Sequence, residues 1–571
     1  MRYGGGRRRR MLLQPFLVLC ATVTGLGLLM LALRPLDPPP IKVVYAKDFQ
    51  LVDSNSSDFD VGDGTLMEKP PPATSKTCAT VEEMGNDFVN GLAVKETLRV
   101  RRIIEQHFVL NGASRVRDLP SDQFCSHGFV LGKTAEAGFG NEMYKLLSAA
   151  ALMSCPMSMS VETYSNMPLM DDQTSLNLVS YNYLGKYPFE DYISYANFTF
   201  TMKEIKHLWR LNGCESKYRR KLVMRTDDFE KPSQTNVLCS NWKEWEQPII
   251  WFQGTNDAVA SQFFLKNVHP QMRIAAYNLF GDPQVLGSQP NVFGELMRVL
   301  ISPSKDVEAA VNWVIGGAEN PDISLHMRMQ TNRSIRALQA VMSCIRKAIE
   351  SQHLMSRPKI VVVSDTPSLF KSIVPNISEF AEVMRFDYEK FKGKMLESLP
   401  KLDFRAKDWG PAPRWVAFVD FFLASRARYA VVSGAQRRVG TTYAQLIAAL
   451  AAAHNLGDDN KKTSGRSFSF FSSFQSNLLT DGLKNQIGWG HVWNRYAGPL
   501  SCHNQSNQCA FTPLLPPAWW DGLWQSPIPR DTKRLAFYGV QLSGFGNVDT
   551  DFLQNYCNSR KTVVRTVTYN L

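Results

Sequence analysis

The strongest constraint on the fold is an alternation of short apolar segments and helical patterns between residues 323 and 455. ISLHMR (323–328), KIVVVSD (359–365) and RYAVVSG (428–434) have the length of buried strands and end in polar residues. The segments RALQAVMSCIRKAIESQ (336–352) and TYAQLIAALAAAHN (442–455) show helical patterns. Buried parallel strands that alternate with helices predict a doubly wound α/β lobe. We expect the functional residues of this lobe directly after the strands, because the carboxyl ends of the strands form the ligand crevice.

A 23-residue apolar run, Met11–Leu33, predicts a membrane span, since about 20 residues cross the hydrocarbon core. The alternative is a cleaved signal peptide, but its apolar region is only about 7–15 residues long and ends at a small-residue cleavage site. Here the run meets Arg34 and a proline-rich segment, which favours an uncleaved anchor. The cluster Arg7–Arg10 precedes the run and is expected to stay cytoplasmic.

The residues after the apolar run have features of a secretory lumen. They contain nine of the ten cysteines, which is consistent with an oxidising compartment. Cys502 and Cys509 flank a polar segment that a local disulfide would close, and the other pairings are open. Because nine is odd, at least one thiol stays free or pairs with another chain. Five glycosylation sequons also follow the run, at Asn55, Asn197, Asn332, Asn376 and Asn504.

Net charge and composition limit the classes of ligand that the chain is expected to bind. The net charge is +12, and Arg2 and Arg7–Arg10 account for five of these charges, which leaves +7 for the rest of the chain. That diffuse excess suits a small anionic ligand, and no basic stripe predicts nucleic-acid binding. Residues 34–77 are rich in Pro, Ser, Asp and Lys, which predicts an extended stem. The acidic segment DFDVGDG (58–64) does not match the residue spacing of a calcium-binding loop in any alignment, so we interpret it as part of the solvated stem.

The first two candidate motifs are a glycine motif that precedes a predicted helix and an arginine motif that ends a predicted strand. Gly138-Phe139-Gly140-Asn141 lies between the strand-like FVLGKTAEA and the helical YKLLSAAALM, an arrangement that directs free backbone N–H groups towards a ligand. The alternative is a tight turn whose glycines serve only the backbone. His326-Met327-Arg328 ends a strand, where an arginine can hold a phosphate with two parallel hydrogen bonds. A surface arginine is the alternative.

Two further motifs follow strands. Asp365 comes after KIVVV, where its carboxylate would accept hydrogen bonds from a ribose or base, or would cap the next helix. The segment 433–442, SGAQRRVGTT, combines glycines, hydroxyls and arginines before a helix and is suited to an anion. It lacks the GxxxxGK[ST] pattern of a P-loop.

Taken in order, GFGNEM, HMR, VVVSD and the block DFFLAS…VVSGAQRRVGTT resemble the fucosyltransferase superfamily that uses GDP-fucose. It includes the α-1,6- and α-1,2-fucosyltransferases and the protein O-fucosyltransferases. The resemblance covers roughly residues 125–455. It implies an α/β fold of two Rossmann-like lobes (GT-B), inversion at the sugar carbon, and neither metal nor cofactor. The implied partners are GDP-fucose as the donor nucleotide sugar and a glycan or glycoprotein acceptor. The segment RYAGPLSCHNQSNQCAFTPLLPPAWWDGLW resembles plant lumenal proteins, which implies a plant Golgi enzyme.

The resemblance also implies roles for single residues. Arg328 matches the arginine that holds the diphosphate and is the predicted catalytic residue. The predicted binding residues are Gly138, Gly140, Asn141, His326, Asp365, Asp420, Ser433, Gly434, Arg438, Thr441 and Thr442. The family often has an acid soon after its HxR motif, whereas this chain has MQTN (329–332), so the general base is unassigned. Glu142 and Asp408 are candidates for it.

Two alternatives to this function stay open. A metal-dependent transferase would use a DxD pair, which Asp549-Thr550-Asp551 supplies, although such patterns arise often by chance. A lumenal scaffold or lectin-like protein would keep the fold without catalysis. The expected organisation is a cytoplasmic tail (1–10), a signal anchor in the Golgi membrane (11–33), a stem (34–77), an N-terminal lobe (78–300), a nucleotide-sugar lobe (301–460) and an extension packed on the lobes (461–571).

Overall fold

The chain divides by its contacts into Met1–Ala73 and Thr74–Leu571. The computed structural model describes residues 92–133, 139–155, 176–181, 192–195, 199–226, 237–245, 249–254, 264–282, 290–317, 319–327, 335–354, 357–366, 370–391, 415–433, 442–456, 469–475, 507–512, 550–559 and 565–568. The predicted tail (1–10), span (11–33) and stem (34–77) lie outside these residues. Among the helices that are described, none has the length and hydropathy of a membrane span.

The first lobe is built on a six-stranded sheet with the order β14-β5-β6-β1-β2-β4. Its strands are β1 (Gly128–Lys133), β2 (Leu176–Tyr181), β4 (Phe200–Thr201), β5 (Lys221–Thr226), β6 (Ile249–Gln253) and β14 (Arg565–Thr568). All neighbours pair in parallel except β14, which runs antiparallel to β5. Strand β1 lies inside the sheet, between β6 and β2, and leads into helix α6.

The second lobe is built on another six-stranded sheet, with the order β10-β9-β8-β11-β12-β13. Its strands are β8 (Ile323–Met327), β9 (Lys359–Ser364), β10 (Glu382–Met384), β11 (Tyr429–Ser433), β12 (Ser469–Gln475) and β13 (Asn507–Thr512). Only β13 is antiparallel. The chain builds outward from β8 to β10 and then returns to place β11 on the other side of β8. The topological switch point therefore lies between β8 and β11.

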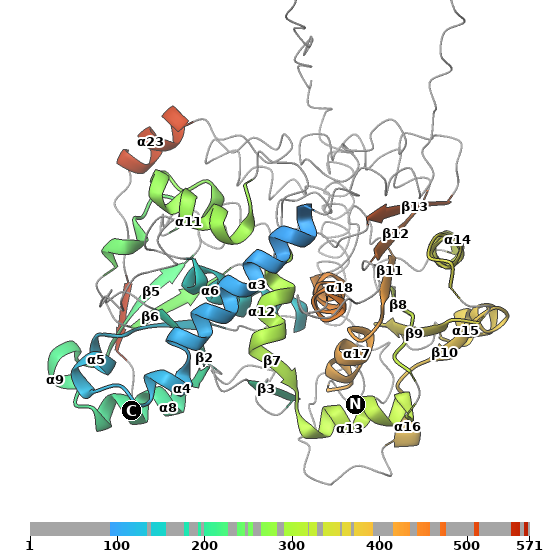
Figure 1. Ribbon diagram of the computed structural model, residues 1–571, viewed down its shortest axis with the longest axis horizontal. Coiled ribbons are helices and arrows are strands. Elements are labelled where there is room, and N and C mark those ends of the chain that lie inside the picture. Colours follow the sequence, from blue (N-terminus) through green and yellow to red (C-terminus); the bar gives the residue numbers. More distant parts are fainter. Residues whose placement is uncertain are drawn as a thin grey trace, which may run out of the picture. The chain divides into compact units, whose positions relative to one another are not determined.

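Helices surround both sheets (Figure 1). Those of the first lobe are α3 (Leu92–Asn111), α4 (Ala113–Val116), α5 (Ser121–Ser126), α6 (Phe139–Ser154), α8 (Met202–Leu211), α9 (Glu215–Tyr218), α11 (Pro270–Phe280), α12 (Val292–Leu300) and α23 (Thr550–Ser559). Those of the second lobe are α13 (Lys305–Ile315), α14 (Ile335–Ser351), α15 (Phe370–Ser378), α16 (Tyr388–Phe391), α17 (Val416–Ala424) and α18 (Thr442–Asn455). Two short strands, β3 (Ile193–Tyr195) and β7 (Ile301–Pro303), pair antiparallel with each other, and a 3-10 turn covers Trp242–Glu244.

The second sheet is covered on both faces, as its near-continuous apolar strands predict. Val361 and Val363 of β9 join a core that contains the aromatic residues of α17. Ile360 and Val362 join a different core, which contains Val341 of α14. Successive side chains of a strand point to opposite faces, so α14 and α17 lie on opposite sides of the sheet. The expectation of an α/β fold is confirmed.

Most predicted elements between 323 and 455 agree with the structure to within a residue or two. Strand β8 and helix α18 cover 323–327 and 442–455, where ISLHMR and TYAQLIAALAAAHN predict a strand and a helix. The segment 155–181, which has no clear pattern, ends in strand β2, and β2 pairs in register with β1. Parallel pairing in the sheet interior makes LNLVSY a strand that periodicity alone does not reveal.

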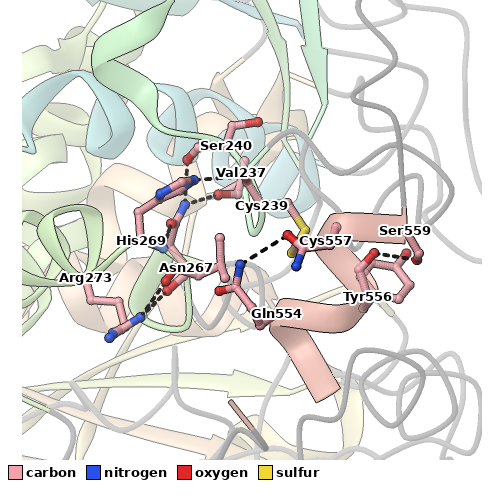
Figure 2. The surroundings of a disulfide bond; sticks show 12 residues. Val237, Cys239, Ser240, Asn267, His269, Arg273, Gln554, Tyr556, Cys557 and Ser559 are labelled. Atoms are coloured by element: carbon pink, nitrogen blue, oxygen red, sulfur yellow. Dashed lines mark hydrogen bonds between the residues drawn. A yellow bond between two sulfur atoms is a disulfide. The ribbon is translucent and has the colours of Figure 1, made fainter. Parts of the chain in front are cut away.

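The C-terminal segment contributes to both lobes. Strands β12 and β13 extend the second sheet, whereas β14 covers the β5 edge of the first. A disulfide joins Cys557 of α23 to Cys239, 318 residues earlier, with 5.4 Å between the Cα atoms. Figure 2 shows this bond beside a compact group of hydrogen bonds, in which His269 Nε2 lies 3.2 Å from the carbonyl oxygen of Cys239 and Arg273 donates to the carbonyl oxygen of Asn267.

A second disulfide, Cys125–Cys214, joins α5 to the turn after α8. Cys155, at the end of α6, is a free and buried thiol, and burial raises its pKa above the usual range. The odd count of cysteines after the apolar run requires a thiol that is free or paired with another chain, and Cys155 is free.

Gly294→Ala tests how closely α12 and α18 pack. A Cβ at Gly294 would lie 2.2 Å from the carbonyl oxygen of Ala449, so the helices must separate. We expect the free energy of unfolding to fall by about 1–3 kcal/mol in denaturant titrations. Gly213→Asn is the control, because Gly213 has a φ of +68°, which Asn tolerates, and a Cβ there would meet nothing within 4 Å. Equal stability of the two variants would contradict the close packing.

The disulfide pairing is testable by labelling and mutation. In denatured but unreduced protein, we expect iodoacetamide to label Cys155 and to leave Cys239 and Cys557 unlabelled. Cys239→Ser should lower the free energy of unfolding by about 2–5 kcal/mol, because the unfolded chain loses a long-range crosslink. Cys155→Ala is the control and should have a smaller effect. Labelling of Cys557 without reductant would show that the bond is absent.

Candidate functional site

The carboxyl ends of β8, β9 and β11 form one edge, and the predicted motifs gather there. Val432 pairs with His326, and Met327 pairs with Ser364, so the residues after these strands leave the sheet at the same level. Ser364 also donates a hydrogen bond from its hydroxyl to the carbonyl oxygen of Met327, at 2.9 Å. This bond ties β9 to the end of β8, the strand that borders the switch point at which a ligand would bind.

His326 is buried near the end of β8 and contacts the first turn of α18. Its ring centroid lies 5.5 Å from that of Tyr443, which places the helix beside the strand end. The Tyr443 hydroxyl in turn donates to the carbonyl oxygen of Ala417 in α17. Tyr443 is not among the residues that the sequence predicts for the site. Its position directly after the predicted hydroxyl pair Thr441-Thr442 is the only signal that marks it.

The first lobe approaches the same edge through the start of α6. The Thr442 hydroxyl donates to Asn141 Oδ1 at 2.7 Å, which links the first turns of α18 and α6. A Cβ at Gly140 would lie 2.5 Å from the backbone nitrogen of Tyr443, so only glycine allows this approach. The structure thus brings Gly140, Asn141 and Thr442 together, although Asn141 and Thr442 are 301 residues apart in sequence.

This approach gives the site two helix N-termini. Helices α6 and α18 both begin beside the Asn141–Thr442 hydrogen bond. The first N–H groups of a helix have no partner within it, and its N-terminal end carries partial positive charge. The arrangement is therefore suited to a phosphate or another anion.

Two predicted acids have different surroundings. Asp365 follows β9 at the same edge, and its Oδ1 accepts a hydrogen bond from the Thr366 hydroxyl at 3.3 Å. Asp420 lies in α17, a helix that packs against β8 and β9. Asp420 as a whole residue is half-buried. Its carboxyl group is surrounded by protein, and this burial raises the pKa of the carboxyl to about 7. Near neutral pH, a part of the population therefore carries a proton there.

The candidate base Glu142 is in an unsuitable place. It is fully buried in the first turn of α6, and Lys145 donates to its Oε1 at 3.4 Å. A carboxylate paired in the interior is not placed to take a proton from an incoming hydroxyl. Gly138, Arg328, Gly434, Arg438, Thr441 and Asp408 lie outside the described residues, and so does the side chain of Ser433. Arg328 is the residue directly after Met327, the last residue of β8.

The described residues contain no group of three or more His, Cys, Asp or Glu side chains that is arranged to hold a metal ion. Of the DxD pattern at 549–551, Thr550 is the first residue of α23, the helix that is disulfide-bonded to the first lobe. The pattern thus belongs to a different element from those that form the candidate edge.

Comparisons with known proteins give a family and distant structural likenesses. A family model described as a family of unknown function, DUF7810, matches residues 73–569. No curated protein is significantly similar to the chain. Among solved structures, a mutant of Arabidopsis thaliana FUT1 in complex with GDP is 10% identical with a TM-score of 0.35, over 60% of this chain and 70% of that one.

The fucosyltransferase NodZ from Bradyrhizobium is 11% identical with a TM-score of 0.32, over 61% of this chain and 95% of that one. The structure of NodZ α-1,6-fucosyltransferase soaked with GDP-fucose is 11% identical with a TM-score of 0.32, over 61% of this chain and 94% of that one. Likeness at this level does not determine the chemistry of this chain.

The raised pKa of Asp420 predicts a pH dependence of stability. The folded carboxyl titrates near 7, above its ordinary value of 3.8, so the folded state holds the proton more tightly. The stabilisation from this group is complete below the unfolded pKa and is lost as pH rises through about 7. Compared with Asp420→Asn, the wild-type thermal midpoint should therefore fall between about pH 4 and pH 7.5, measured by thermal unfolding in ligand-free buffer. Parallel curves for the two proteins would show that Asp420 titrates normally.

Proposed function

We propose that this chain, which belongs to the family of unknown function DUF7810, transfers fucose from GDP-fucose to a hydroxyl of a glycan or glycoprotein. In this proposal the two sheets are the lobes of a GT-B-type glycosyltransferase. The reaction inverts the sugar carbon and uses no metal or other cofactor.

One observation carries the proposal. Parts of all four motifs that resemble GDP-fucose-dependent enzymes lie on elements at one edge of the second sheet, although Asn141 and Thr442 are 301 residues apart. His326 and Ser364 end neighbouring strands, and Thr442 begins the helix that follows β11. Asn141 joins them from the first lobe. Motifs that matched by chance would have no reason to meet at a switch point.

The proposed step is a direct displacement. The acceptor oxygen forms a bond to the anomeric carbon of fucose, while the bond from that carbon to the β-phosphate oxygen breaks. The electron pair stays on the departing GDP, and the acceptor proton passes to a base that has not been identified. Negative charge grows on the diphosphate, so fixed cations and N–H groups nearby would lower the barrier.

Residues of this chain would supply that stabilisation. Arg328 would hold the diphosphate through two parallel hydrogen bonds, since it follows β8 at the switch point. The first turns of α18 and α6 would add N–H groups and positive dipole ends. Asp365 would accept hydrogen bonds from the nucleoside. Exact placement of donor and acceptor would contribute further, by making the reaction effectively unimolecular.

The proposed setting is the Golgi lumen of a plant cell. Residues 11–33 would anchor the chain in the Golgi membrane as a type II protein, and residues 34–77 would form a stem. The two disulfides within the described residues are consistent with an oxidising compartment.

A scaffold or lectin-like role is the second candidate. It is favoured by one observation, the sequence MQTN (329–332) where the resembling enzymes often have an acid after HxR. A chain without its base would keep the nucleotide site and lose turnover.

Nucleotide binding by the Thr74–Leu571 unit tests the proposal. We expect isothermal titration to show GDP binding that persists in EDTA and exceeds UDP binding. Arg328→Ala should weaken it about 10- to 100-fold, because two charged hydrogen bonds are lost. Arg428→Ala is the control, since this exposed arginine precedes β11 at the opposite edge of the sheet.

Three outcomes are distinct. GDP binding followed by fucose transfer to an acceptor supports the enzyme. GDP binding without transfer to any acceptor, or to water, favours the scaffold. A folded protein that binds neither nucleotide contradicts the proposed function.

A further inference from the structure

Helix α18 belongs to the second lobe by sequence, but the first lobe holds it by hydrogen bonds. The bonded positions on α18 and in the turn after it share one face of the helix, because they recur every three or four residues. They are Thr442, Gln445, Ala449, Ala453 and Leu456. The contacts therefore extend along the whole helix, about 20 Å at 1.5 Å per residue.

Near the N-terminal end, α6 supplies the partners. Besides the Asn141–Thr442 bond, the Tyr144 hydroxyl donates to Gln445 Oε1 at 3.1 Å. Both Tyr144 and Gln445 are buried, so water does not compete for this bond.

Further along the helix, side chains of the first lobe bind its backbone. Asn291 Nδ2 donates to the carbonyl oxygen of Ala449 at 2.7 Å. Arg101 of α3 donates to the carbonyl oxygens of Ala453 and Leu456, at 2.8 and 2.7 Å. Carbonyls in the last turn have no partner within the helix, and a cation there also offsets the negative end of the helix dipole.

Arg101 is itself held rigidly. Its Nε and Nη2 donate to the two carboxylate oxygens of Glu295 at 2.8 and 3.0 Å. Glu295 is fully buried and also accepts from Arg298 at 3.0 Å. A buried bidentate pair fixes the guanidinium in one orientation, so the atoms that bind α18 are fixed as well.

The other side of α18 has a different character. Ala444, Ala448 and Ala452 pack into the core of the second sheet. Methyl groups make contacts without direction, whereas hydrogen bonds require defined positions of both partners. Two hydrogen bonds also join the ends of α18 to the second lobe, from the Tyr443 hydroxyl to the carbonyl oxygen of Ala417 and from Asn455 Nδ2 to the carbonyl oxygen of Ala427. The first lobe adds the bonds to Gln445, Ala449, Ala453 and Leu456, so both lobes set the axial position of α18.

We infer that Arg101 and Asn291 are positioning residues for the candidate nucleotide site, which they do not touch. They bind the far end and the middle of α18, and so contribute to where its first turn lies beside His326 and Asn141. The part that concerns nucleotide affinity rests on the proposed function.

The test must separate positioning from stability, because Arg101→Ala would leave Glu295 buried without its main partner. The double variant Arg101→Met/Glu295→Met avoids this, since apolar replacement of a buried ion pair is often neutral for stability. We expect the full-length variant to keep a thermal midpoint close to wild type. Its dissociation constant for GDP should rise about tenfold, because the first turn of α18 is displaced. Hydrogen exchange without ligand should be faster in peptides from 442–456.

Arg298→Met is the matched control, because Arg298 joins the same ion-pair cluster but donates to no atom of α18 among the described contacts. It should keep wild-type GDP affinity and wild-type exchange in α18. A folded double variant with unchanged GDP affinity and unchanged exchange would overturn the inference. If wild-type protein binds no GDP, the proposed function fails, and the exchange measurement alone decides whether Arg101 positions α18.

Discussion

The close packing of α18 against α6 and α12 is the constraint on which the rest of the structure depends. At two points a glycine lets backbone meet backbone, Gly140 against Tyr443 and Gly294 against Ala449. A side chain at either position would separate the helices by more than a hydrogen bond can span. The bonds to Thr442 and Ala449 exist only because these glycines allow them. Through α18, residues 139–143 of the glycine motif are brought to strands β8 and β11.

The sequence predicts the second lobe well because its signal is local. Strands such as KIVVVS are buried on both faces, so they appear as unbroken apolar runs between helical patterns. The edge at which the motifs gather follows from the parallel arrangement, which directs every carboxyl end to the same side. His326, Asp365 and Thr442 were predictable as candidates for this reason.

Other features depend on contacts that no local pattern records. Strand β2 lies in a segment without a clear pattern and β14 has only four residues, so their pairing partners define them. The bonds of Arg101 to α18 join residues 352 and 355 positions apart, and an arginine in an amphipathic helix is expected to face solvent. The burial of Glu142 could not be predicted from the sequence either, because an acid in the first turn of a helix usually interacts with the helix dipole at the surface. Disulfide pairing has many combinations, so neither bond could be assigned from spacing.

The return of the chain to its first sheet has a consequence for biosynthesis. Cys125 forms its disulfide with Cys214, 89 residues later, whereas the partner of Cys239 is 318 residues later in the sequence. A chain that emerges vectorially can therefore close the first bond early, while β5 keeps an uncovered edge until β14 arrives. During that interval Cys239 is open to wrong partners, and the bare strand is open to pairing with other nascent chains. The first lobe is thus complete only after residues 557–568 have been made, although most of its residues are made far earlier.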